Sequence, residues 1–116
     1  MAVRSIGVLA GLALSVSSPA VAQDTAKVER GQAVFAEQKC ALCHSVGGKG
    51  NTKGALDDVG SKVTADEMRQ WLVSPKEMGE KAKATRKPPM KSFATKLTDD
   101  EKREIANWIV TLKKTN

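Results

Sequence analysis

The chain has 116 residues, a mass of 12.4 kDa and a net charge of +6 at neutral pH, so it holds a single domain. It has two phenylalanines, two tryptophans and no tyrosine, and the core of so small a domain usually needs reinforcement, here by a group outside the polypeptide. Two cysteines and one histidine are too few for a disulfide-dense scaffold or a zinc finger with four protein ligands, and the length argues against most large-pocket enzymes.

Residues 1–22 have the three parts of a secretory signal: Arg4 near the start, an apolar run over 6–16, and small residues that end at Ala22. The apolar run is too short to cross a bilayer, which takes about 20 residues. We expect cleavage after Ala22 and export of residues 23–116 as one domain, most simply to a bacterial periplasm. An uncleaved amino-terminal anchor is the alternative. No second hydrophobic segment follows, so a soluble mature chain without a transmembrane segment is expected.

Apolar residues at helical spacing predict helices over residues 25–38, 64–73 and 99–113. The last has the clearest pattern, and Lys113 and Lys114 at its end suit the negative end of the helix dipole. No segment alternates with a period of two, so strands are not expected. The apolar faces consist of Val28, Gly31 and Phe35 in the first helix, Met68, Trp71 and Leu72 in the second, and Ile105, Trp108, Ile109 and Leu112 in the third.

Three Ser/Thr-x-x-Glu motifs, which begin at Thr64, Ser74 and Thr98, mark expected helix starts. In each motif the hydroxyl can accept from the N3 amide, while the glutamate accepts from the amide of the cap residue. Pro75 suits the first helical position after Ser74, where no amide hydrogen is needed.

Two long loops rich in glycine and lysine, residues 45–62 and 79–96, connect the predicted helices. Loops of this length are uncommon inside a compact domain unless they have a function of their own. The sequence therefore predicts an all-α domain whose loops wrap around a bound group.

The run Cys40-Ala41-Leu42-Cys43-His44 follows the first predicted helix and has the spacing of a c-type haem attachment site. Two thiols at this spacing can each add to one vinyl group of the porphyrin, and the next residue offers its imidazole to the iron. A thioredoxin-like dithiol would need a βαβ setting that the chain lacks, and a structural disulfide is the other alternative. The sequence thus predicts one covalently bound haem c, with Cys40 and Cys43 as tethers and His44 as an axial iron ligand.

With this motif the chain resembles the class I, monohaem c-type cytochromes over almost all of its mature part. The resemblance also rests on Gly31-x-x-x-Phe35, the loop Leu56-Asp57-Asp58-Val59-Gly60, a Pro-Pro-Met segment and Trp108 in the closing helix. It implies a small cytochrome c fold in which three to four helices surround the haem. It also implies that the first and last helices cross, with Gly31 allowing Trp108 to pack closely.

The resemblance implies a methionine thioether as the second axial ligand, and the chain has four methionines. Met1 would be removed with the signal, and Met68 lies on an apolar helix face, where packing is its expected role. Met90 follows two prolines, which lower the entropy lost in holding a weak ligand, and similar cytochromes carry their ligand in this context. We expect Met90 to bind the iron; Met78 is the alternative ligand, and packing is the other role open to Met90.

One departure from the family concerns the group that orients His44. Related sequences usually have Gly-Pro before the Leu-x-x-Val-Gly loop, and a carbonyl there accepts from the second ring nitrogen of the ligand histidine. This chain has Lys53-Gly54-Ala55-Leu56 without the proline, so the acceptor is expected at Gly54 or a neighbour. The choice bears on the reduction potential, because such hydrogen bonds tune ligand basicity.

His/Met ligation would fill all six positions of the iron, so the predicted function is single-electron transfer, as a periplasmic shuttle or as the haem subunit of an oxidoreductase. Residues 81–96 include six basic residues and no acidic one, which predicts a positive surface for redox partners with an acidic face. An ordinary solvated loop is the alternative. Export and the scarcity of aromatics argue against nucleic acid, while an anionic membrane surface is a further candidate.

A haem enzyme or gas-sensing haem protein, with a weak or absent Met ligand, is the alternative from another class. The sequence offers no evident nucleophile or acid–base pair, and Gly47-Gly48-Lys49-Gly50 lacks the context of a phosphate-binding loop. A monomer or a subunit of a complex is expected. Without haem, the polypeptide is expected to be largely unfolded.

Overall fold

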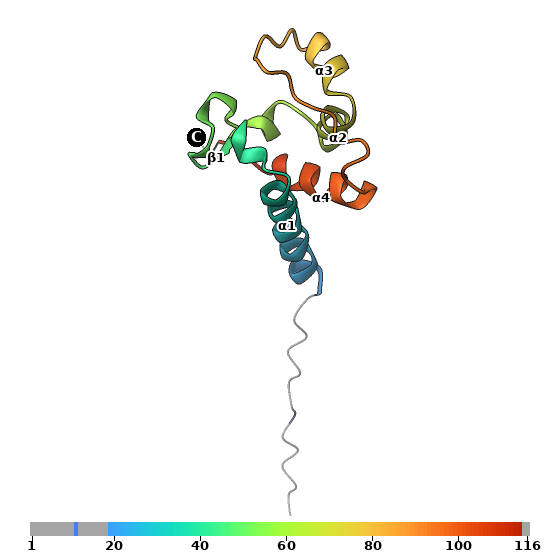
Figure 1. Ribbon diagram of the computed structural model, residues 1–116. Helices are drawn as coiled ribbons and strands as arrows, with labels where there is room; N and C mark the ends of the chain where they lie inside the picture. Colours follow the sequence, from blue (N-terminus) through green and yellow to red (C-terminus); the bar gives the residue numbers. More distant parts are fainter. Residues whose placement is uncertain (1–10, 12–18, 115–116) are drawn as a thin grey trace, which may run out of the picture.

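The structure is a computed structural model that describes residue 11 and residues 19–114 (Figure 1). The signal predicted over residues 1–22, and Met1 with it, therefore lies mostly outside the described residues. The elements in chain order are α1 (Pro19–Glu37), η1 (Cys40–Leu42), β1 (Ser45–Val46), β2 (Lys49–Gly50), η2 (Thr52–Gly54), η3 (Val59–Ser61), α2 (Ala65–Val73), α3 (Pro75–Lys81) and α4 (Asp99–Ile109). The domain is all-α apart from one short hairpin, as expected. Within the described part of the chain, no helix combines the length and apolarity needed to cross a membrane.

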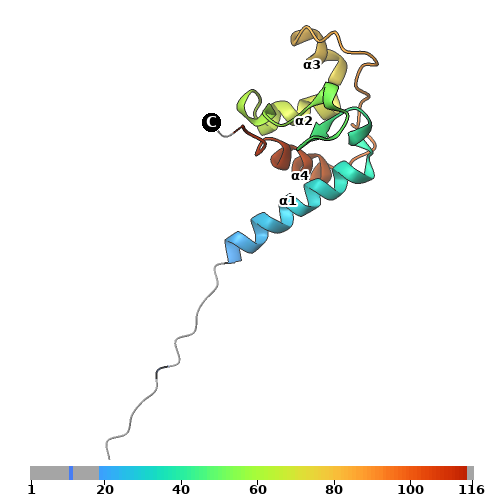
Figure 2. The ribbon, with the colours of Figure 1, turned by 90° about the vertical axis from the view of Figure 1, so that its left-hand side faces the viewer.

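Helices α1 and α4 cross and form the centre of the core (Figures 1 and 2). A Cβ atom at Gly31 would lie 2.7 Å from both the Glu104 carbonyl oxygen and the Trp108 Cβ, so only glycine permits this approach. Beside it, the rings of Phe35 and Trp108 meet edge to face with centroids 5.3 Å apart. The Arg30 guanidinium pairs with the Glu104 carboxylate across the crossing at 3.2 Å. The predicted close packing of Gly31 and Trp108 is confirmed.

Helix α1 begins at Pro19, six residues before the start expected from the apolar pattern. Residues 19–24 include two alanines, and proline suits the first turn of a helix, so the added turns contain no strong helix breaker. The carboxyl end lies at Glu37, one residue from its predicted position.

Helix α4 starts with the predicted capping box. The Glu101 amide donates to the Thr98 hydroxyl at 3.1 Å, and the Thr98 amide donates to the Glu101 carboxylate at 3.0 Å. Its end at Ile109 is earlier than predicted, so Lys113 and Lys114 lie beyond the last turn, and their expected dipole role is wrong. The chain leaves the helix because residues 110–114 bond instead to the loop around η3: the Gly60 amide donates to the Leu112 carbonyl at 2.9 Å.

Helix α2 also has its predicted capping box, between Thr64 and Glu67, and it buries Met68 and Leu72 in the core. Helix α3 follows after one residue and lies at the end of the molecule opposite α1 (Figures 1 and 2). Pro75 occupies its first turn as predicted, but Ser74 makes no side-chain cap, so the third capping box is wrong. The backbone of Ser74 also ends α2, and its ψ of 58° is not that of an ordinary cap residue.

The expectation of no strands is wrong at one place, where β1 and β2 pair antiparallel with Val46 opposite Lys49. Gly47 and Gly48 have φ of 59° and 79°, and two positive φ values are what a tight two-residue hairpin turn requires. The strands are too short for a period-two pattern to show in the sequence. The hairpin and the η2 and η3 turns together order most of the predicted 45–62 loop, while α3 shortens the second loop to residues 82–98.

Candidate haem-binding site

The Cys40–His44 run forms one tight turn directly after α1. Lys39 takes a left-handed conformation with φ of 56° and ends the helical direction, and η1 follows at Cys40. The amides of Cys43 and His44 both donate to the Cys40 carbonyl, at 3.1 and 2.9 Å. This hydrogen bonding brings the two cysteines and the histidine of the motif together within a single turn of backbone.

The two thiols are free and differ in exposure. Cys40 is half-buried and packs against the core, and burial raises the pKa of its thiol to about 11. Cys43 is exposed. Neither thiol is part of a disulfide, so both sulfur atoms are available for thioether bonds to a porphyrin.

The imidazole of His44 is oriented by the Gly54 carbonyl, which lies 3.0 Å from Nδ1. A carbonyl can only accept, so Nδ1 carries the proton, and the lone pair of the neutral ring is on Nε2. Burial lowers the pKa of His44; the Gly54 hydrogen bond opposes this, and the Arg86 charge adds to it. The ring is therefore neutral at pH 7, with Nε2 as the nitrogen suited to bind iron.

The expected acceptor near Gly54 is thus found, even though the usual proline is missing. A Cβ at Gly54 would overlap the Cys43 carbonyl oxygen and the Arg86 guanidinium, so the backbone here has room for glycine alone. Gly50 has a φ of 105°, and a Cβ added there would likewise overlap the His44 carbonyl oxygen. Close backbone packing, rather than a proline, holds this loop against the turn.

Two residues at this site were missed by the sequence reasoning. Asn51 joins the hairpin to the turn, because its amide donates to the Ala41 and His44 carbonyls at 3.0 Å and its side chain donates to the Leu42 carbonyl at 3.2 Å. Arg86 reaches from the 82–98 loop to Gly54. A lone asparagine in a glycine-rich loop carries no pattern, whereas the basic run around Arg86 was noticed for its charge only.

Ser45, directly after His44, is the buried polar residue of this region. It is 1% exposed, and within the described residues its hydroxyl has no hydrogen-bond partner. A buried hydroxyl without a partner is unusual and indicates a neighbouring group beyond the polypeptide. Together with two free thiols and a neutral imidazole, this orphaned hydroxyl makes the donor set of the turn fit a covalently bound haem.

The candidate methionines occupy different surroundings. Met68 is buried in the core at 7% exposure, as expected for a packing residue. Met90 is half-buried and packs against the core from the 82–98 loop, and it lines an open groove beside Val73 and Pro75. Met78 is half-buried on α3 and lines a separate groove formed with α2. Met90 is thus on a different segment from the Cys40–His44 turn, and Arg86 of that segment lies against Gly54, whose carbonyl orients His44.

Within the described residues, no group of three His, Cys, Asp or Glu side chains could hold a metal ion by itself.

The family model for cytochrome c matches residues 28–113, which include α1 from Val28 onward, the Cys40–His44 turn and all of α4. The chain belongs to the cytochrome c family. Its fold is accordingly the small all-α cytochrome c fold, its cofactor is covalently bound haem c with iron, and its general function is electron transfer with redox partners. No curated protein and no solved structure matches the chain closely enough to count as a relative.

Proposed function

We propose that this protein is an exported carrier of single electrons whose haem iron is bound by His44 and Met90. Cys40 and Cys43 are the sites of the two thioether bonds. The observation that carries the proposal is the hydrogen bond of 3.0 Å between His44 Nδ1 and the Gly54 carbonyl. This bond fixes the orientation of the neutral imidazole and leaves the lone pair of Nε2 available to bind iron. Haem c bound in this way supplies reversible one-electron oxidation and reduction of its iron.

The neighbours of His44 act on the reduction potential in opposite directions. The Gly54 carbonyl fixes the ring and increases its basicity, while burial of the turn and the Arg86 charge disfavour added positive charge. A neutral thioether ligand also favours ferrous over ferric iron. Burial, the Arg86 charge and the thioether thus favour ferrous iron, whereas the Gly54 hydrogen bond favours ferric iron. The carrier is proposed to accept electrons from a dehydrogenase or quinol-oxidising complex and to pass them on.

Met90 is proposed over Met78 on packing. Its side chain lies against the hydrophobic core, and residues 92–94, just beyond it, are hydrogen-bonded to the end of α2. Met78 is held in the middle of α3, where helical backbone bonds fix its direction and neighbouring residues are charged.

Export and partners complete the proposal. Residues 1–22 form a secretory signal cleaved after Ala22, which places the domain in the periplasm, where it acts as a shuttle.

Six basic residues of the 81–96 segment are all exposed, and among the described residues the acid paired with one of them is Glu77, 3.0 Å from Lys81. Acidic redox partners would be attracted to this surface, with association that weakens as salt rises. The six residues are Lys81, Lys83, Arg86, Lys87, Lys91 and Lys96.

The test is the visible spectrum of the purified haem-loaded protein. We expect a sharp α-band when reduced and, when oxidised, the weak long-wavelength band of an iron–methionine bond. Met90→Ala should abolish that band, and Met78→Ala should leave it unchanged. Loss of the band in Met78→Ala instead would show that the ligand assignment is wrong. A native protein without the band that binds carbon monoxide readily would be a haem enzyme or sensor.

A further inference from the structure

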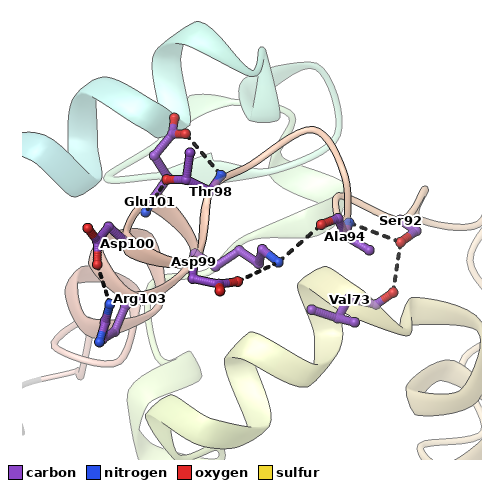
Figure 3. A network of polar contacts seen from close by, with 9 residues as sticks. Val73, Ser92, Ala94, Thr98, Asp99, Asp100, Glu101 and Arg103 are labelled. Carbon is purple, nitrogen blue, oxygen red and sulfur yellow. Dashed lines mark hydrogen bonds and ion pairs between the residues drawn. The ribbon is translucent and has the colours of Figure 1, made fainter.

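The 82–98 loop is attached to the helices by a small hydrogen-bond network around Ser92 (Figure 3). The Ser92 hydroxyl donates to the Val73 carbonyl at 2.7 Å and accepts from the Ala94 amide at 3.2 Å. Next to it, the Phe93 amide donates to the Leu72 carbonyl at 2.7 Å. The segment 92–94 is therefore joined to the last residues of α2.

The carbonyls used by this network are available for a structural reason. Helix α2 ends at Val73, and the last carbonyls of a helix have no partner within it. Pro75 lacks an amide hydrogen, so the start of α3 cannot satisfy all of them. Ser92 and Phe93 supply donors to two of these carbonyls from a segment about 20 residues further along the chain.

Helix α4 supports the same segment from the other side. The Lys102 ammonium donates to the Ala94 carbonyl at 3.1 Å and pairs with Asp99 at 3.2 Å, and its side chain is only 13% exposed (Figure 3). Leu97, at the end of the segment, is buried in the core. Residues 92–97 are thus held by both α2 and α4.

Met90 lies two residues before this attachment. On its amino side, residues 85–89 are all exposed, and two of them are prolines without amide donors. Arg86, four residues before Met90, lies against Gly54, so Met90 lies between that contact and the attachment through Ser92. Among the described residues, this hydroxyl makes the side-chain hydrogen bond between the segment and α2. Phe93 and Leu97 add apolar contact with the core, and Lys102 adds a hydrogen bond from α4.

We propose that Ser92 is the positioning residue for the methionine ligand: its hydroxyl, bonded to the Val73 carbonyl, keeps the loop closed so that the Met90 sulfur stays on the iron. This inference rests on the proposed ligation by Met90. Loss of the hydroxyl leaves the fold intact, because the core and the α4 contacts remain. It makes opening of the loop easier by the net value of one exposed hydrogen bond.

The experiment is an imidazole titration of the ferric, haem-loaded protein, followed by loss of the long-wavelength iron–methionine band. Imidazole can bind only when Met90 has left, so its apparent affinity measures loop opening. Ser92→Ala is expected to bind imidazole about three- to tenfold more tightly than the wild type, as the loss of one hydrogen bond predicts. Ser92→Thr keeps a hydroxyl and should restore wild-type affinity. Amide exchange at Ala94 should be faster in Ser92→Ala alone.

Two controls separate positioning from general destabilisation. Thr95→Ala removes an exposed hydroxyl of the same segment that has no hydrogen bond among the described residues, and Thr64→Ala removes the capping box at the far end of α2. Neither should change imidazole affinity, although Thr64→Ala lowers the unfolding temperature. Equal affinity in Ser92→Ala and wild type, or an equal shift in Thr64→Ala, overturns the positioning role.

The positioning role of Ser92 can be wrong while the proposed function is right, and the two failures are distinguishable. If Met90→Ala abolishes the band while Ser92→Ala leaves imidazole binding unchanged, Met90 is the ligand and Ser92 does not position it. If Met90→Ala leaves the band in place, the ligation and the role of Ser92 are both wrong.

Discussion

The crossing of α1 and α4 buries its side chains against other protein side chains, whereas the loops that carry the proposed haem ligands bury almost none. The buried hydrophobic core consists of residues from α1, α2 and α4 together with Leu97. Over residues 39–67 and 73–96, the structure shows just one buried residue in each stretch, Ser45 and Pro75. One region is thus stabilised by packing, and the other mainly by hydrogen bonds between backbone and side chains.

This difference shows where the cofactor contributes to stability. The helix crossing has its own apolar contacts, including the edge-to-face pair of Phe35 and Trp108. The loops have two free thiols at their start and a buried hydroxyl at Ser45 that finds no partner in the part of the chain that the structure describes. Haem is a large apolar group, and its covalent attachment supplies the burial that these loops cannot obtain from the polypeptide.

The largest effect should follow from preventing haem attachment. A Cys40→Ala/Cys43→Ala variant without haem is expected to lose most of its helical signal in far-ultraviolet circular dichroism, because the crossing alone is too small a core for a chain of this size. Native-like helicity in this variant would show that packing is sufficient and that the two regions do not depend on each other.

A smaller effect, confined to the helix crossing, is expected from Gly31→Ala. The added Cβ would lie 2.7 Å from the Glu104 carbonyl oxygen and the Trp108 Cβ, so the helices must separate. We expect a loss of about 1–3 kcal/mol in the free energy of unfolding, measured by denaturant titration of the haem-loaded protein.

Gly79→Ala is the matched control, since Gly79 also lies inside a helix, and its added Cβ meets nothing nearer than 3.9 Å. It should stabilise the protein by about 0.4–1 kcal/mol. Destabilisation of equal size in both variants would mean that close approach at the crossing is not the cause.

The smallest expected effect is on how stability changes with pH, and it compares one carboxylate from each region. The Thr98 amide holds the pKa of Glu101 below its ordinary value at the start of α4, and the Lys114 amide does the same for Asp58 in the loop. A carboxylate with a lowered folded-state pKa stabilises the fold above its unfolded pKa, and this contribution is lost as pH falls through the folded value.

Glu101→Gln and Asp58→Asn should therefore each lower the unfolding temperature at pH 7 and differ little from wild type near about pH 2, where the carboxylates are protonated. Thermal unfolding at a series of pH values measures this. A pH-independent difference for Asp58→Asn would show that its hydrogen bonds, and not its charge, hold residues 110–114 to the loop.

The sequence predicted the helices and the haem turn well, because their signals are local. Thr64 and Thr98 each satisfy a helix terminus within three residues, and the spacing of Cys40, Cys43 and His44 depends on one turn of backbone. The motif at Ser74 failed because α2 ends at the same residue, so one backbone conformation could not serve two helices. The hairpin at Ser45 was missed because two-residue strands are too short to show a period.

By itself, the sequence determined the class of fold and the haem turn, since each is written in spacing along a short stretch of chain. The crossing of Gly31 with Trp108 was predicted only through the resemblance to class I cytochromes, because these residues are far apart in the chain. Only the tertiary structure decided that Gly54 orients His44, that Asn51 bonds to the turn while Arg86 lies against Gly54, and that Ser92 holds the Met90 segment against α2. These contacts join residues about 10 to 30 positions apart in the chain. They depend on which carbonyls the folded backbone leaves without partners, and that is settled when the elements pack.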